Sequence, residues 1–191
     1  MLPLPEPAQP LQEASAGGTF TLRVVPGEAA ATLLEWLRPG APEGSAVSRL
    51  GEAMHRLLET APADGRLRPA QLREVERNFG LDGAALKQAE AMAQRILQGE
   101  GAWAWDATQV DWQDNEVELL AGGELLRLDR LVRRRDTGEW WVLDYKSAAQ
   151  PERQPQLMEQ MRRYREAVAA ANEGAVVRTA FLTAQGKLVP A

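Results

Sequence analysis

The chain has 191 residues, of which 45% are hydrophobic and 26% charged, with a net charge of −5 and no cysteine. This composition is typical of a globular protein with a core of ordinary size. The lack of cysteine excludes disulfides, zinc–thiolate sites and iron–sulfur clusters within these residues. No apolar run approaches the roughly 18 residues of a membrane span, and no basic and apolar leader opens the chain. We therefore expect no membrane association and a cytoplasmic protein.

The first 45 residues carry weak signals. Residues 1–18, MLPLPEPAQPLQEASAGG, are rich in Pro, Ala, Glu and Gly and show no periodicity, which predicts an arm or linker. Residues 19–25 have β character, and residues 27–38 have the spacing of a helix that PGAPEGS then ends.

Helical spacing continues in three segments, at about 46–60, 69–78 and 82–98. The apolar stripe of the first segment consists of Val47, Leu50, Met54, Leu57 and Leu58. Because these positions recur every three or four residues, they are expected to face the core together. Gly99 and Gly101 end the third segment.

After residue 110 the pattern changes to alternation. The run NEVELLAGGELLRLDRLVRRR predicts two strands joined by a turn at Gly122-Gly123, and DTG (136–138) predicts another turn. EWWVLDYK has a near-continuous apolar centre, which indicates a strand in the middle of a sheet. A long amphipathic helix follows at 155–173, and AVVRTAFLTA and KLVP predict two last strands.

The order of elements, helices followed by β-β-β-α-β-β, predicts an α/β fold. A mixed sheet packed by helices fits this order, with a crossover through the helix that follows the third strand. We expect residues 19–191 to form one domain, with a helical part at 27–100 and a sheet core at 107–191.

The third strand ends on charge. Period-two alternation places Asp144 and Lys146 on one face and Tyr145 on the other. Pairing across the DTG turn would bring Asp129 opposite about 142–143. Two carboxylates repel unless a cation shares them, and their hard oxygens suit Mg²⁺ or Mn²⁺. The alternative is a buried Asp–Lys ion pair at a strand end.

Four motifs occur in order along the chain. They are Gly51-Glu52-Ala53-Met54-His55, Asp129, Asp144-Tyr145-Lys146 and Gln160-Met161-Arg162-Arg163-Tyr164. Over roughly residues 45–190, this set resembles the nuclease domain of the RecB/AddA branch of the PD-(D/E)XK superfamily. The resemblance implies a restriction-endonuclease-like fold with an N-terminal helical segment, and a DNA nuclease that depends on Mg²⁺ or Mn²⁺.

The resemblance also implies roles for individual residues. Asp129 and Asp144 would be the metal carboxylates, and the Tyr145 carbonyl would be a backbone ligand. Lys146 would be the catalytic lysine. His55 would reach the metal from its helix, although a lone histidine on a helix is also an ordinary interface residue.

Further positions are implied less directly. Gln160 and Tyr164 share a helix face and would shape the site near the DNA strand, but they also fit a polar pair on a core helix. Glu116 resembles the acid that opens the first core strand and is a possible accessory acid, with Glu118 competing on the same strand face.

The stretch from Arg127 to Arg165 holds ten Lys and Arg against six Asp and Glu, so phosphate contacts are expected there. The candidates are Arg127, which stands where the family often has glycine, Arg130, Arg133, Arg134, Arg135, Arg162, Arg163 and Arg165. A solvated surface is the alternative for each. Trp103 and Trp105, before the sheet, are candidates for base stacking.

In this branch the nuclease domain is usually fused to a UvrD/Rep-like helicase. The chain holds no P-loop motif, so it is either a C-terminal piece of a longer helicase–nuclease or a domain that stands alone. The proline-rich arm favours the first. The resemblance then implies an exonuclease acting on single-stranded DNA that a motor supplies, in double-strand-break repair and recombination. The alternative is a catalytically silent DNA-binding or subunit-docking module of the same fold.

Overall fold

The computed structural model describes residues 46–62 and 64–191. The predicted arm at 1–18, strand at 19–25 and helix at 27–38 lie outside the described residues. In the part of the chain that the structure describes, no helix combines the length and the apolar character needed to cross a membrane.

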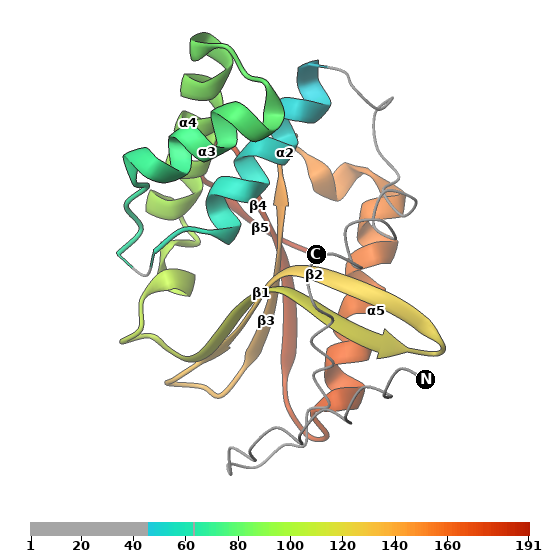
Figure 1. Cartoon of the computed structure of the whole chain (residues 1–191). Coiled ribbons are helices and arrows are strands. Elements are labelled where there is room, and N and C mark those ends of the chain that lie inside the picture. The colour runs from blue at the N-terminus through green and yellow to red at the C-terminus, as the bar shows by residue number, and fades with distance from the viewer. Residues whose placement is uncertain (1–45, 63) are drawn as a thin grey trace, which may run out of the picture.

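From residue 46 on, helices and strands follow in the predicted order (Figure 1). The elements are α2 (Ala46–Glu59), α3 (Pro69–Phe79), α4 (Gly83–Gln98), η1 (Ala102–Trp105), β1 (Val110–Ala121), β2 (Glu124–Arg134), β3 (Trp140–Lys146), η2 (Pro151–Arg153), α5 (Pro155–Ala171), β4 (Val177–Thr183) and β5 (Leu188–Pro190). Asp82 caps α4, since its carboxylate accepts backbone N–H groups of Ala84 and Ala85. The segment before the sheet, for which no element was predicted, forms the short 3₁₀ helix η1.

The sheet is mixed, with the strands in the order β1-β2-β3-β4-β5. Strands β3 and β4 are parallel and joined by a crossover through α5, whereas the other neighbours are antiparallel. The predicted α/β class and the central place of β3 are both confirmed.

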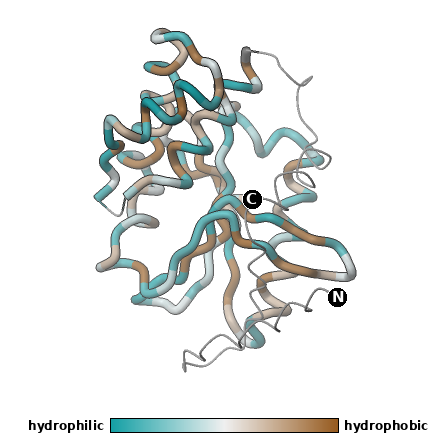
Figure 2. Tube along the Cα trace, in the orientation of Figure 1, coloured by the Kyte–Doolittle hydropathy of each residue, from teal (hydrophilic) through white to brown (hydrophobic). Residues whose placement is uncertain are grey.

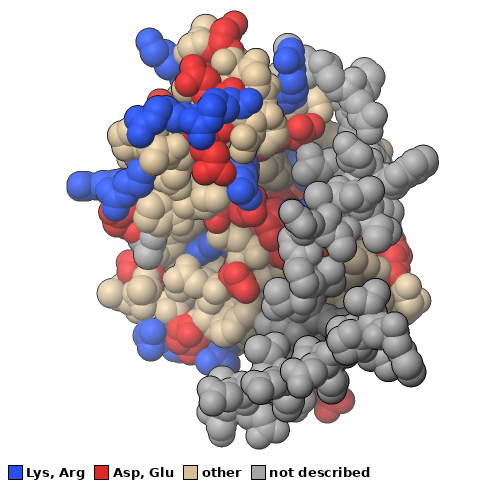
Figure 3. Space-filling model, viewed as in Figure 1, with Lys and Arg blue, Asp and Glu red and all other residues tan. Residues whose placement is uncertain are grey.

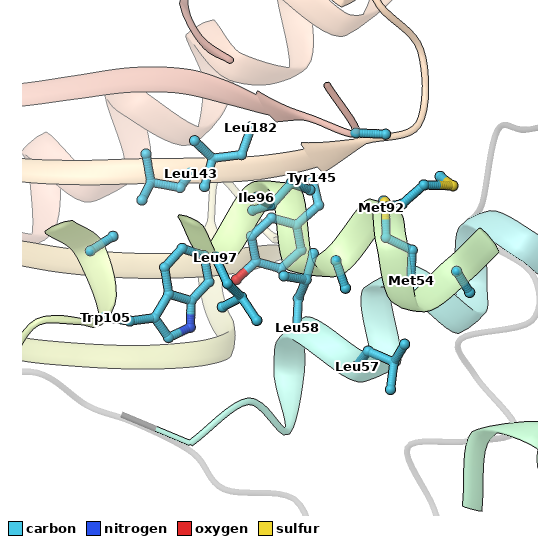
Figure 4. Packing of buried hydrophobic residues seen from close by; sticks show 14 of the residues in the cluster. Met54, Leu57, Leu58, Met92, Ile96, Leu97, Trp105, Leu143, Tyr145 and Leu182 are labelled. Atoms are coloured by element: carbon cyan, nitrogen blue, oxygen red, sulfur yellow. The ribbon is translucent and has the colours of Figure 1, made fainter. Parts of the chain in front are cut away.

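Two apolar clusters lie on the two faces of the sheet. On one face, Leu143 and Tyr145 pack against α2, α3 and α4, a group that we call the helical-side cluster (Figure 4). On the other, Trp140 and Val142 pack against α5 in the α5-side cluster. Alternation along β3 therefore divides its side chains between the two layers.

The helix α2 contributes to the helical-side cluster with most of its predicted stripe. Met54, Leu57 and Leu58 are fully buried, and Leu50 packs against them. Val47 is 70% exposed, so its predicted burial is wrong. It lies in the first turn of α2, before the helix reaches the sheet, and periodicity alone does not tell where a helix leaves the core.

The hairpin of β1 and β2 separates from β3 partway along its length (Figure 1). Strands β2 and β3 pair from Arg133 opposite Trp140 to Arg130 opposite Leu143, whereas β1 and β2 stay paired to their turn. The outer half of the hairpin, rich in apolar residues, joins the α5-side cluster (Figure 2). Among the described non-glycine residues, only Glu116 has a positive φ, +54°. This left-handed residue interrupts the extended run of β1 where the hairpin departs.

The two-cluster arrangement predicts how leucines on the strands affect stability. Replacing the buried Leu143 with alanine should lower the free energy of unfolding by about 2–5 kcal/mol, because a cavity remains between β3 and the helices. Leu120→Ala, at a leucine that is 76% exposed, should change it by less than about 0.5 kcal/mol. Urea unfolding followed by circular dichroism measures both, and equal losses would contradict the assignment of the core.

Candidate active site

The candidate site lies where β2 and β3 separate. Asp129 immediately precedes Arg130, the first residue of β2 that pairs with β3, and its Oδ2 accepts the backbone N–H of Tyr145 at 2.8 Å. A side-chain carboxylate thus takes the place of a strand carbonyl. Val132 lies opposite Trp141, so continuing the pairing puts Asp129 level with Asp144, one residue beyond the approximate position of 142–143 that was predicted. The turn sequence did not reveal this shift.

Asp144 and Lys146 share one face of β3, as the alternation predicted. The Lys146 Nζ lies 2.6 Å from Asp144 Oδ2, and Asp144 is 2% exposed. The ring of Tyr145 points to the opposite face, into the helical-side cluster. The end of β3 therefore presents two opposite charges on one side and an apolar ring on the other.

The helix α2 brings His55 to the same place. Its Nε2 lies 2.8 Å from the carbonyl oxygen of Tyr145, a residue 90 positions later, and its Nδ1 lies 3.6 Å from Asp129 Oδ2. The imidazole also meets the ring of Tyr145 edge-on, with centroids 5.5 Å apart. The imidazole thus lies at the interface of α2 and β3 beside Asp129, and its role as a metal ligand stays a prediction.

The helix α5 borders the site through Gln160 and Tyr164. The Gln160 amide donates to the Tyr164 hydroxyl at 2.6 Å, and Tyr164 is 7% exposed. Burial raises the pKa of Tyr164 to about 12, and the charges of Asp144 and Asp129 add to the shift. Tyr164 is thus both a core residue and close enough to sense the two carboxylates; its contact with DNA stays a prediction.

Burial and repulsion by Asp129 set the charge state of Asp144. Burial raises the pKa of Asp144 to about 6, with the neighbouring Asp129 contributing to the rise and Lys146 opposing it. Burial alone would lower the pKa of Lys146, but the attraction of Asp144 and Asp129 outweighs it and the pKa is raised. Lys146 therefore stays cationic, and its single positive charge faces the negative charges of two carboxylates.

The donor set suits a hard divalent cation. Asp129 and Asp144 offer carboxylates, Tyr145 a carbonyl and His55 an imidazole. No described residue hydrogen-bonds the buried Oδ2 of Asp144, because its contact with Lys146 is an ion pair without hydrogen-bond geometry. The 2.8 Å between His55 Nε2 and the Tyr145 carbonyl oxygen is near the roughly 3 Å that separates neighbouring ligands with Mg²⁺-length bonds.

The same donors do not form a closed metal cage. Within residues 46–62 and 64–191, no group of three or more His, Cys, Asp and Glu side chains is arranged to hold a metal ion. In the present geometry Asp144 turns to Lys146 and Asp129 to the Tyr145 N–H. The residues therefore match a divalent ion in chemistry, and binding would require their side chains to close around it.

Glu116 and Arg127 form an ion pair on the hairpin beside Asp129. Each thus has a partner within the protein, and the predicted roles as accessory acid and phosphate contact stay predictions. Glu118 lies opposite Arg127 on the adjacent strand.

Arg130 and Trp105 do not lie where their predicted roles require. Arg130 is 2% exposed, and its guanidinium donates to Asn115 Oδ1 at 2.6 Å and to the Ala104 carbonyl at 2.7 Å. Trp105 is 3% exposed and stacks on Tyr145. A buried guanidinium cannot meet a phosphate, and a buried indole cannot meet a base, so both predictions are wrong. The alternating pattern around Arg130 does not reveal its burial, and Asn115, an unusual strand residue, is a signal that was missed.

The remaining cations are mostly engaged at the surface. Ion pairs join Arg133 with Asp111, Arg134 with Asp136, Arg162 with Glu159 and Glu166, and Arg163 with Glu124. Arg135 donates to backbone carbonyls, and Trp103 packs against Trp141. On the face in Figure 3, Lys and Arg are interspersed with Asp and Glu and do not form one basic surface. Phosphate contacts by these arginines and by Arg165 stay predictions.

The family model of the PD-(D/E)XK nuclease superfamily matches residues 29–188. The chain belongs to this superfamily. Within the matched range, Asp129 lies in the middle of β2, and Asp144 and Lys146 lie at the end of β3; their roles in the site stay predictions. The mixed sheet is the restriction-endonuclease-like core, and the domain belongs to a superfamily of nucleases that typically use divalent metals. A search of the curated proteins finds no match.

The raised pKa of Asp144 predicts a pH dependence in metal-free protein. Above pH 6 the buried carboxylate is ionised and destabilises the fold. As the pH falls through about 6, the folded protein binds a proton that the unfolded chain, with a pKa of 3.8, does not yet bind. Between pH 7 and pH 5, the unfolding free energy of wild type should therefore rise by about 1 kcal/mol more than that of Asp144→Asn.

Urea unfolding in the presence of a chelator measures this difference, and Asp136→Asn, at an exposed turn carboxylate, is the control. A wild-type minus Asp144→Asn difference that is the same at both pH values would contradict the assignment.

Proposed function

We propose that the domain hydrolyses phosphodiester bonds of DNA with the help of Mg²⁺ or Mn²⁺. The observation that carries the proposal is the convergence of Asp129, Asp144 and Lys146 with His55 and the backbone of Tyr145 at the point where β2 and β3 separate. The buried carboxylate of Asp144 and the partly buried carboxylate of Asp129 repel each other, and a divalent cation would relieve that repulsion.

In this proposal each group has a separate task. Asp129, Asp144, the Tyr145 carbonyl and His55 would hold the ion. A bound divalent ion would lower the pKa of a coordinated water and offset charge on the phosphate. Lys146, kept cationic by the two carboxylates, stabilises the negative charge that develops on the phosphate oxygens. Gln160 and Tyr164 contact the DNA strand from α5.

We further propose that the domain is of the RecB/AddA type. The support is the ordered presence of Gly51…His55 on α2 and Gln160…Tyr164 on α5 beside the strand motifs. By the same resemblance, the activity is exonucleolytic on single-stranded DNA delivered by a helicase, in the cytoplasm, during double-strand-break repair and recombination.

One observation favours a second candidate function. The ion pair of Asp144 with Lys146 satisfies both charges without a metal, which also suits a catalytically silent DNA-binding or docking module. Metal binding and cleavage separate the two functions.

The proposal predicts that cleavage depends on Lys146. Wild-type protein with Mg²⁺ or Mn²⁺ should degrade labelled single-stranded DNA, and Lys146→Ala should lower kcat about 100-fold or more, because the charge-stabilising ammonium is lost. Lys87→Ala, at an exposed lysine of α4, should leave kcat unchanged. Denaturing gels follow the products, and a chelator should abolish cleavage. Equal rates for wild type and Lys146→Ala would leave only the silent module.

The proposal also predicts metal binding next to His55, the only histidine of the chain. Sub-stoichiometric Mn²⁺ should broaden the imidazole proton resonances of wild-type protein, because a paramagnetic ion would lie within a few ångströms of the ring. Asp144→Asn should need about tenfold more Mn²⁺ or more for the same broadening, since one ligand charge is lost. Asp136→Asn is the control. Sharp His55 resonances in wild type at saturating Mn²⁺ would contradict the metal site.

A further inference from the structure

We infer that Arg130 is a positioning residue of the candidate site, acting through Trp105 to hold the backbone of Tyr145 in place. This inference deepens the proposed function and rests on it for its consequence in catalysis. Its structural part, the restraint on Tyr145, can be measured in metal-free protein.

Arg130 is a buried cation without an ion pair among the described residues. It is 2% exposed, and the acceptors around its guanidinium are neutral: the side chains of Asn115 and Gln113 and the carbonyl of Ala104. Burial lowers its pKa, and the nearby Tyr145 and Asp114 offset only part of that effect. Burying a cation among neutral acceptors costs folding free energy. A role for the contacts of Arg130 in the site would explain why the protein tolerates this cost.

A stack of rings leads from Arg130 to the site. The guanidinium lies 4.4 Å from the centroid of the Trp105 ring. The indole in turn stacks on Tyr145, with centroids 6.2 Å apart and planes inclined by 20° (Figure 4). The Tyr145 ring also meets the ring of His55 in an edge-on contact. Arg130 therefore packs on Trp105, and Trp105 packs on Tyr145, whose backbone lines the site.

Tyr145 needs this support because it has no paired strand on the β2 side. Its pairing with Leu182 on β4 remains, but past Arg130 the strand β2 offers it no backbone partner. Its N–H binds Asp129 and its carbonyl meets His55, each at 2.8 Å. Fixing the ring fixes both groups, because the side chain and the two peptide planes meet at one Cα.

A second route leads from Arg130 to the helix that carries His55. Asn115, which accepts from Arg130, donates its own amide to the carbonyl of Glu59 at 2.7 Å. Glu59 is the last residue of α2, one turn beyond His55. The same guanidinium thus restrains both elements that would supply a carbonyl and an imidazole to the ion.

The restraint on Tyr145 is tested first without metal. Arg130→Lys keeps the charge but loses the planar fork that spans Asn115, Ala104 and the indole. Hydrogen exchange should show the Tyr145 N–H exchanging about tenfold or more faster, relative to Ala180 in β4. Arg133→Lys is the matched control, since Arg133 also lies over a tryptophan ring, but on the outer part of the sheet. Unchanged protection of Tyr145 in Arg130→Lys would overturn the inference.

The consequence for the site is tested with Mn²⁺ and single-stranded DNA. Arg130→Lys should raise the Mn²⁺ concentration for half-broadening of His55 by about tenfold. It should lower kcat at limiting Mn²⁺, while the KM for DNA changes less than about twofold. A raised KM with unchanged Mn²⁺ binding would instead indicate a phosphate contact and overturn the inference. Equal effects of Arg133→Lys would indicate general destabilisation and overturn it as well.

Two further variants separate the aromatic stack from the Tyr145 hydroxyl. Trp105→Phe keeps a ring in the core and should reproduce the faster Tyr145 exchange if Arg130→Lys does not fold. Tyr145→Phe keeps the ring and the backbone that carry the restraint, so the N–H of residue 145 should keep its wild-type exchange rate. If wild-type protein fails to bind Mn²⁺, the proposed function fails, while the exchange measurement still decides the positioning role.

Discussion

The hydrogen bond from the Tyr145 N–H to the Asp129 carboxylate is the contact on which the site depends. At this point β2 stops pairing with β3, and a buried N–H without a partner would destabilise the fold. Asp129 satisfies that N–H from its side chain, so the strands can part without leaving an orphaned group. The carboxylate thereby lies in the opening between the strands, where a metal ligand would be needed.

Charge balance is the second constraint at this opening. Asp144 is buried beside Asp129, and only Lys146 and, when protonated, His55 can offset the two carboxylates among the residues that the structure describes. Burial is the main cause of the elevated pKa of Asp144, and the charge of Asp129 adds to it. A divalent cation would complete the charge balance, which is why an arrangement that is costly for a structural domain is reasonable for a superfamily of metal-dependent nucleases.

Neighbouring charged residues of β2 have different environments for a simple geometric reason. Asp129 faces the opening, and Arg130, one position later, points to the other face and is enclosed by η1 and β1. Arg133 and Arg134, farther along, pair with surface carboxylates. The same residue type therefore supports the core in one case and covers the surface in the others.

The sequence by itself determined the order of elements, the α/β class and the shared face of Asp144 and Lys146, because these follow from short-range periodicity. The sequence also showed the four motifs in their family order, but it did not show which of their residues contact one another. The register of β2, the burial of Arg130 and the approach of His55 to Tyr145 were decided by tertiary structure. They depend on how the hairpin departs from the sheet and on contacts between residues up to 90 positions apart, and no local pattern encodes either.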